Sequence, residues 1–197
     1  MIRNFKKDLD NMSKSKTIPG ISERISILRG RCLDRKAARG NPPNWRTVVD
    51  AEVLRHSEEV ESWQLRMGMR TKARLEAMEF ETDGLELLAG RVKFGDYGFT
   101  EREIADSEKY LSQYKWPGGQ TGHCAMDMRR VFKVGLGGIS SDLRGRMKSA
   151  SGGKRDTYQS FIYAVEGMSE MIVNAKSAAV QAGRNAPQWR RMEIGEI

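Results

Sequence analysis

The chain has 197 residues, of which 39% are hydrophobic and 30% are charged, and its formal net charge at pH 7 is +8. This length and composition lie in the globular range and exclude a wholly disordered chain. No stretch approaches the roughly 20 apolar residues that span a bilayer. Residues 1–17 also lack the apolar centre of a secretory signal. We therefore expect a cytoplasmic protein with no membrane partner.

Residues 1–20 are predicted to form a mobile N-terminus, and residues 21–197 a single, mainly helical region. Apolar residues recur every three to four positions over residues 21–39, which predicts a helix with Ser22 as its N-cap. The Gly-Asn-Pro-Pro sequence at 40–43 ends this helix, because proline cannot continue it.

Further along the chain, one or two surface helices are expected over residues 44–81. The compact apolar run at 85–92 is short enough to be a buried strand. Thr100 and Glu103 have the spacing of a capping box, which predicts a helix that ends near Tyr114. A helix over residues 127–133 would place Met128, Val131 and Phe132 on one face, and residues 149–153 are predicted to be a flexible loop.

The last long helix is predicted over residues 154–182. Its apolar residues repeat at intervals of three and four, at Tyr158, Phe161, Ile162, Val165, Met168, Ile172, Ala175 and Ala179. Gly183 is expected to cap its C-terminus. Pro187 should prevent its continuation.

Five segments together carry a resemblance to a known family. A Gly-His turn at 121–127 leads into a short helix with a Gly-rich end at 135–139, and the long helix at 154–182 follows after a loop. The Glu-Leu-Leu-Ala-Gly sequence at 86–90 matches an "ELIVG" element, and residues 185–193 match an "NPxRRxEL" step. This order resembles the N-terminal region of the glycyl radical enzymes, the family of pyruvate formate-lyase and of the diol, choline and hydroxyproline lyases and dehydratases.

The resemblance covers about residues 21–193, but only the leading portion of a family chain that is several times longer. It implies a mainly α fold with one or two short β-strands, forming the N-terminal helical part of an α/β barrel. In the full enzyme it implies lyase, dehydratase or formate acetyltransferase chemistry in an anaerobe. A glycyl radical would be installed there by an S-adenosylmethionine iron-sulfur activase.

The two groups that radical chemistry needs are not found in this chain. The family's cysteine lies in a Gly-Cys-Val/Ile-Glu type of loop, which neither Cys32 nor Cys124 matches. Its radical glycine lies in an Arg-Val-x-Gly type of sequence, which Gly195 does not match. No catalytic residue is therefore assigned, no cofactor or metal is expected in this chain, and the chain by itself should be inactive.

The pattern stops inside the family sequence, so the expected partner is the remainder of the enzyme or a complementary subunit. A severed segment should expose an apolar face, which we expect on the helix at 154–182 and on the run at 85–92. A homo-oligomer would be another way to cover that face.

Two residues are candidates for substrate binding. His123 lies where polyol-dehydrating relatives use a histidine to bind a hydroxyl, and a neutral imidazole both donates and accepts. Its structural alternative is a bond to a backbone carbonyl beside the turn. Asp127 could direct an acceptor toward the same pocket, whereas its structural alternative is an N-cap for the following helix. His56, on a charged helix, is given no role.

The basic character, with a sequence pI near 9.6, leaves one alternative function. Lysine and arginine neutralise phosphates, so a basic helical nucleic-acid-binding protein, or a helical scaffold, stays open. Acidic residues are interspersed with the basic ones along the predicted helices, which favours a solvated surface, and we expect no nucleic-acid partner. The distant cysteines, Cys32 and Cys124, predict neither a disulfide framework nor a zinc site.

Overall fold

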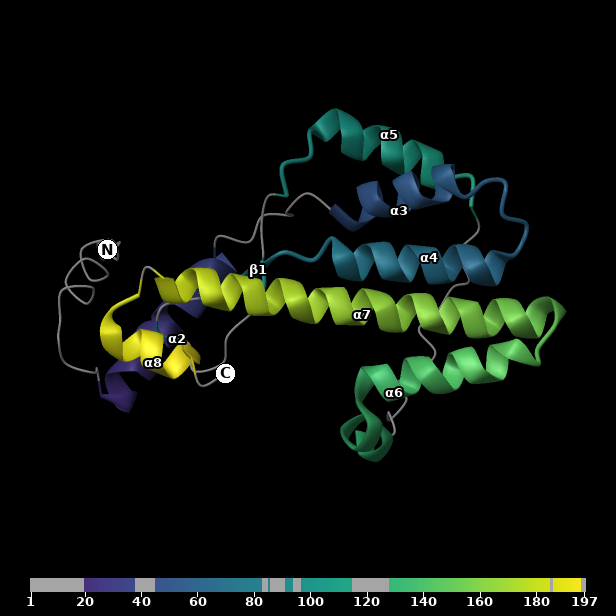
Figure 1. Ribbon diagram of the computed structural model, residues 1–197. Helices are drawn as coiled ribbons and strands as arrows, with labels where there is room; N and C mark the ends of the chain where they lie inside the picture. The colour runs from purple at the N-terminus through teal and green to yellow at the C-terminus, as the bar shows by residue number, and fades with distance from the viewer. Residues whose placement is uncertain are drawn as a thin grey trace. The chain divides into compact units, whose positions relative to one another are not determined.

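A computed structural model describes residues 20–37, 45–82, 85, 91–93, 97–114, 128–184 and 186–195. This described part is mainly helical with two short strands, as expected (Figure 1). The elements in chain order are α2 (Ile21–Ala37), α3 (Trp45–His56), α4 (Trp63–Glu76), β1 (Phe80–Glu81), β2 (Arg91–Val92), α5 (Glu101–Leu111), α6 (Met128–Lys148), α7 (Gly152–Arg184) and α8 (Gln188–Gly195). None of the described helices is both long enough and apolar enough to cross a bilayer.

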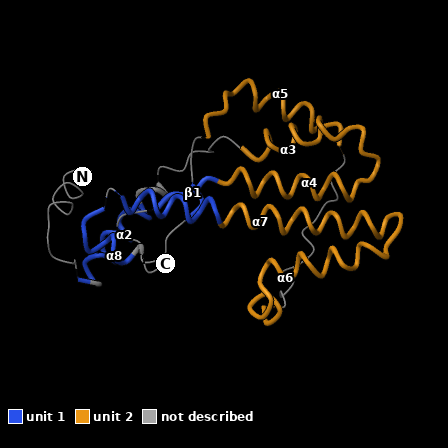
Figure 2. The backbone as a smooth tube through the Cα atoms, viewed as in Figure 1, with its two compact units in different colours: residues 1–41, 79–94, 173–197 blue, residues 42–78, 95–172 orange. Residues whose placement is uncertain are grey.

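Backbone contacts divide the chain into two compact units (Figure 2). One comprises residues 1–41, 79–94 and 173–197, and the other comprises residues 42–78 and 95–172. Helix α7 contributes residues to both units.

In the larger unit, α3 packs against both α4 and α5 (Figure 1). The side chains of Ala51 and Leu54 on α3 are fully buried. At the start of the same helix, the Trp45 ring stacks on Tyr97 with 4.9 Å between ring centroids. Aromatic stacking and full burial of apolar groups are the main stabilising contributions expected for so small a core.

Helices α4 and α7 lie unusually close together, because glycines form part of their contact. A Cβ atom at Gly68 would lie 2.6 Å from the Cα atom of Ser160, and one at Gly167 would lie 2.8 Å from the Cα atom of Lys72. Neither position has room for a side chain unless the backbones move apart. The fully buried Ile162 of α7 lies in the same stretch of helix.

Helix α5 begins with the predicted capping box. The Thr100 side chain accepts from the Glu103 backbone N–H, and the Glu103 carboxylate accepts from the Thr100 backbone N–H at 2.7 Å. The helix ends at Leu111, three residues before the predicted end, so Tyr114 lies in the turn that follows.

Helix α6 extends much further than the short helix predicted at 127–133. It runs to Lys148, with one break at Gly135, whose φ of 62° is readily adopted only by glycine. The Gly-rich stretch at 135–139 therefore interrupts a helix instead of ending it. None of the described side chains of α6 is buried, and Phe132 is 81% exposed.

Two predicted helix caps are wrong. Ser22 lies inside α2, which begins one residue earlier with a bond from the Arg24 N–H to the Gly20 carbonyl. Gly183 lies inside α7 with a negative φ, because this helix continues to Arg184. The predicted loop at 149–153 is also shorter than expected, since α7 starts at Gly152.

In the smaller unit, β1 and β2 pair in antiparallel register, with Phe80 opposite Val92 and Glu81 opposite Arg91. The Arg91 guanidinium also donates to the Glu81 carboxylate at 2.6 Å. Of the strand predicted at 85–92, Leu85 lies in a turn and is 4% exposed, and residues 86–90 lie outside the described part.

Candidate functional site

The two predicted substrate-binding residues, His123 and Asp127, lie outside the residues that the structure describes. Helix α6 begins at Met128, directly after Asp127, where the predicted helix was expected to start. His56 is exposed, and its Nδ1 atom lies 2.8 Å from the Glu52 carbonyl oxygen.

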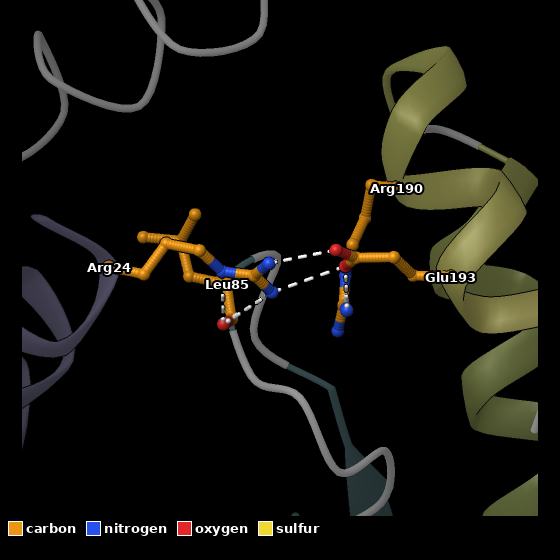
Figure 3. A network of polar contacts seen from close by, with 4 residues as sticks. All are labelled: Arg24, Leu85, Arg190 and Glu193. Carbon is orange, nitrogen blue, oxygen red and sulfur yellow. Dashed lines mark hydrogen bonds and ion pairs between the residues drawn. The ribbon is translucent and has the colours of Figure 1, made fainter. Parts of the chain in front are cut away.

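The most constrained polar cluster in the smaller unit is centred on Arg24 of α2 (Figure 3). The Arg24 side chain is almost completely buried, at 5% exposure. Its two terminal nitrogens donate to the two carboxylate oxygens of Glu193, at 2.8 and 3.1 Å. One of them also donates to the Leu85 carbonyl oxygen at 3.1 Å. Such a two-pronged pair fixes the orientation of both side chains.

Helix α8 adds two more residues to this cluster. Arg190 is fully buried, and its Nη1 atom donates to Glu193 at 2.8 Å (Figure 3). The Trp189 ring lies 5.4 Å from the guanidinium carbon of Arg24, within the range of a cation–π contact. Helix α8 begins just after Pro187, whose carbonyl accepts the first backbone bonds of the helix.

The electrostatics of the cluster hold Glu193 as an anion. Hydrogen bonding from Arg24, followed by that from Arg190, lowers the pKa of Glu193 below its ordinary value. A carboxylate with a lowered pKa and two arginine partners is a poor proton donor or acceptor near neutral pH. The cluster can therefore hold three segments together, but it provides no acid–base group.

Sequence reasoning missed the Arg24 cluster. The sequence signals were the three-residue spacing of Arg190 and Glu193 on one helix and the resemblance of residues 185–193 to the "NPxRRxEL" step. Nothing in the sequence indicated that Arg24, which is 169 positions from Glu193, would be their partner.

In the larger unit, Asp50 of α3 is also a carboxylate that two arginines share. It is 3% exposed and accepts from Arg70 at 2.7 Å and from the Nε atom of Arg74 at 2.5 Å. A further contact joins Arg74 Nη2 to the second Asp50 oxygen. The three residues tie α3 to α4, and a buried carboxylate of this kind requires such partners.

A tyrosine pair lies beside these helices. Tyr110 donates to Glu58 at 2.6 Å, and its oxygen lies 2.9 Å from that of Tyr114. Arg66 donates to Tyr114 and to the Leu54 carbonyl, each at 3.1 Å. Burial is the main cause that raises the pKa of Tyr110 far above its ordinary value, so this phenol stays neutral and cannot act as a base at physiological pH.

Two open cavities lie in the larger unit. One, of about 860 Å³, is formed between α3 and α5 and is bordered by Arg55 and Tyr110. The other, of about 580 Å³, is lined by α3, α4 and α7 and is bordered by His56, Lys72 and Tyr163. Cavities of this size accommodate small ligands. Some polar groups on their rims already have partners, since Arg55 donates to the Asp106 carbonyl and Tyr110 to Glu58.

Lys72 also has a partner. Its ammonium group donates to Glu166 at 3.0 Å, and that bond is the main cause that raises the pKa of Lys72 above its ordinary value. A nucleophilic lysine needs the opposite shift, because only the neutral amine attacks. The bond therefore favours the charged form of the lysine and stabilises the contact of α4 with α7.

No group of three or more metal-ligating side chains is found within the described ranges. Cys32 is an exposed free thiol, and Cys124 lies outside those ranges. Comparison of the chain with protein-family models, with curated proteins and with solved structures finds no match.

Proposed function

We propose that this chain is the N-terminal portion of a glycyl radical enzyme, acting either as part of a longer polypeptide or as one subunit of a split enzyme. It would supply outer helices and one wall of the substrate pocket. The thiyl-forming cysteine and the radical glycine would come from the remainder. The substrate-binding roles of His123 and Asp127 belong to this proposal.

The observation that carries the proposal is the exposed apolar stripe of α7. Phe161, Met168 and Ile172 recur at intervals of seven and four, which places them on one face of the helix, and they are 51%, 37% and 51% exposed. Half-buried Val165 continues the same stripe. A monomeric protein rarely leaves such a row uncovered, so the stripe supports a larger assembly. It lies on the helix where the resemblance placed a face that meets the rest of the barrel.

The Arg24 cluster gives separate support. Arg190 and Glu193 belong to the segment that resembles the family's "NPxRRxEL" step, and Leu85 immediately precedes the segment that resembles "ELIVG". Arg24 donates to both Glu193 and the Leu85 carbonyl oxygen, and Arg190 donates to Glu193. If the chain shares its fold with the family, its motif residues should form such a buried network.

The proposal is tested first by the native mass of the protein. An antibody raised against residues 152–184 should detect, in anaerobically grown source cells, a species much larger than the 22.3 kDa of this chain. Alternatively, it should detect a stable complex with a second polypeptide. That species, after isolation and activation without oxygen, should show an organic radical by electron paramagnetic resonance.

A triple variant sharpens the test if the partner is a separate subunit. Replacing Phe161, Met168 and Ile172 with serine should abolish the complex, because the stripe would be its contact. A matched triple variant of exposed polar residues on α7, with Lys176, Ser177 and Gln181 replaced by alanine, should leave it intact. A free species near 22 kDa, with no radical-bearing partner, would refute the proposal.

A further inference from the structure

One described segment of the chain is strongly basic, contrary to the even mixture expected from the helical pattern. Residues 128–155 contain eight lysine and arginine residues and one carboxylate, Asp142, a net charge of +7. The segment comprises α6, the turn after it and the first residues of α7.

All eight of these cationic side chains are exposed: Arg129, Arg130, Lys133, Arg144, Arg146, Lys148, Lys154 and Arg155. Three of them have carboxylate partners, since Arg130 and Arg146 contact Asp142, and Arg144 contacts Glu166. The other five, Arg129, Lys133, Lys148, Lys154 and Arg155, have no ion-pair partner among the described residues. Their charge is therefore available to an external anion.

The unpaired cations form two groups. Lys148, Lys154 and Arg155 lie around the short turn where α6 reverses into α7 (Figure 1). Arg129 and Lys133 lie at the other end of α6, one helical turn apart. The helical segment from 136 to 148 separates the groups by on the order of 20 Å, given a rise of about 1.5 Å per residue.

An exposed aromatic ring accompanies the second group. Phe132 lies three residues after Arg129, so these two side chains are neighbours on the helix surface, and Lys133 lies one turn from Arg129. At 81% exposure, Phe132 is the most exposed of the large hydrophobic side chains described. A ring this open to water, next to cations without a described ion-pair partner, has the composition of a base-stacking position.

We propose that α6 and the α6–α7 turn bind single-stranded nucleic acid. The five unpaired cations would contact phosphates, and Phe132 would stack on a base. The separation of the two cation groups requires an extended polyanion instead of a single small anion. This proposal goes beyond the proposed function and does not rest on it.

Single-stranded nucleic acid fits these observations better than the other two partners for a basic surface. An acidic polypeptide would satisfy the cations but has no need for an exposed ring. An anionic membrane would need a continuous apolar face beside the charges. On α6, the exposed Met128 and Phe132 lie one turn apart, but the helix breaks at Gly135, so this apolar face does not continue to the cations at the other end.

The test uses the full 197-residue chain and fluorescently labelled 16-nucleotide oligo(dT) and oligo(U), with binding followed by anisotropy. Five phosphate contacts predict a slope of about −3.5 for log K against log salt. The affinity should therefore fall roughly 100-fold between 50 and 200 mM salt. Replacing Lys148, Lys154 and Arg155 with glutamine should leave a slope of about −1.4 and a loss of only roughly sevenfold over that range.

A charge-matched control separates a localised site from a general effect of net charge. Arg29, Lys176 and Arg184 are also exposed and have no ion-pair partner among the described residues. Replacing these three with glutamine removes the same charge and should leave the slope near −3.5, as for the unaltered chain. Circular dichroism would verify that both triple variants keep their helix content.

Binding by variants of Phe132 distinguishes a nucleic acid from other polyanions. Phe132→Leu should weaken oligo(dT) binding about tenfold, and Phe132→Trp should restore it, because stacking needs an aromatic ring. Any of the following results would overturn the proposal: no salt-dependent binding at 50 mM salt, equal effects of the two triple variants, equal affinity for poly-glutamate, or binding only to phosphatidylserine vesicles.

Discussion

The α3–α4–α5 assembly and the hairpin of α6 with the first half of α7 use similar residues in opposite ways. In the assembly, charged groups are buried and paired, as Asp50 is between Arg70 and Arg74, and apolar groups such as Leu54 are fully covered. In the hairpin, the side chain of the shared carboxylate Asp142 is 36% exposed, and Phe132 is open to water.

This difference separates two kinds of surface in one chain. In the assembly, buried charged groups pair with one another and the apolar side chains are covered, so these charges stabilise the fold. The hairpin has apolar and basic groups that its own residues do not cover, so those groups are available to a partner.

The largest effect should come from the buried member of the two shared carboxylates. Asp50→Ala leaves two arginines without their buried partner and should lower the free energy of unfolding by about 3 kcal/mol. Asp142→Ala removes an equally paired but exposed carboxylate and should cause no measurable change. Urea denaturation of both variants makes the comparison, and equal losses would show that burial does not distinguish the two regions.

A smaller effect is expected where α4 meets α7. Gly68→Ala would place a Cβ atom 2.6 Å from the Ser160 backbone, and overpacking of this kind costs about 1–3 kcal/mol. Gly145→Ala in α6 meets no atom within 4 Å and should instead stabilise the chain by about 0.5–1 kcal/mol, because alanine favours helix. Thermal unfolding should therefore shift in opposite directions for the two variants, and shifts in the same direction would mean that the helices are not in close contact.

The smallest effect concerns Glu193, a carboxylate that, like Asp50, has two arginine partners. Its pKa is lowered in the folded chain, so its contribution to stability is complete above its ordinary pKa of 4.5 and is lost as the pH falls through the lowered value. Glu193→Gln should flatten this part of the stability profile below pH 4.5. Denaturation midpoints measured from pH 6 down to pH 3 would show it, and parallel profiles for the two proteins would contradict the assigned ion pair.

Local sequence signals predicted the local features well. The capping box of Thr100 and Glu103 was confirmed because both partners lie within one turn of the same helix. The long helix at 154–182 was confirmed, with slightly wider bounds, because its apolar repeat is unbroken. The two wrong caps, Ser22 and Gly183, show the limit of such signals, since a residue suited to a cap is also tolerated inside a helix.

The candidate site could be predicted only in part. His123 and Asp127 remain predictions, because they lie outside the described residues. The long second part of α6 was missed because glycines at 135, 137 and 138 indicated the end of a helix. Only Gly135 departs from helical geometry, and the residues after it resume the helix.

By itself, the sequence determined a mainly helical chain, the approximate positions of its helices and the apolar stripe of α7, because these depend on spacing along one element. Tertiary structure alone decided which charges are buried and paired. Arg24 with Glu193, and Asp50 with Arg70 and Arg74, are brought together by folding across long separations in sequence. It also decided that Phe132 is exposed, since a periodic pattern marks the apolar face of a helix but not what covers it.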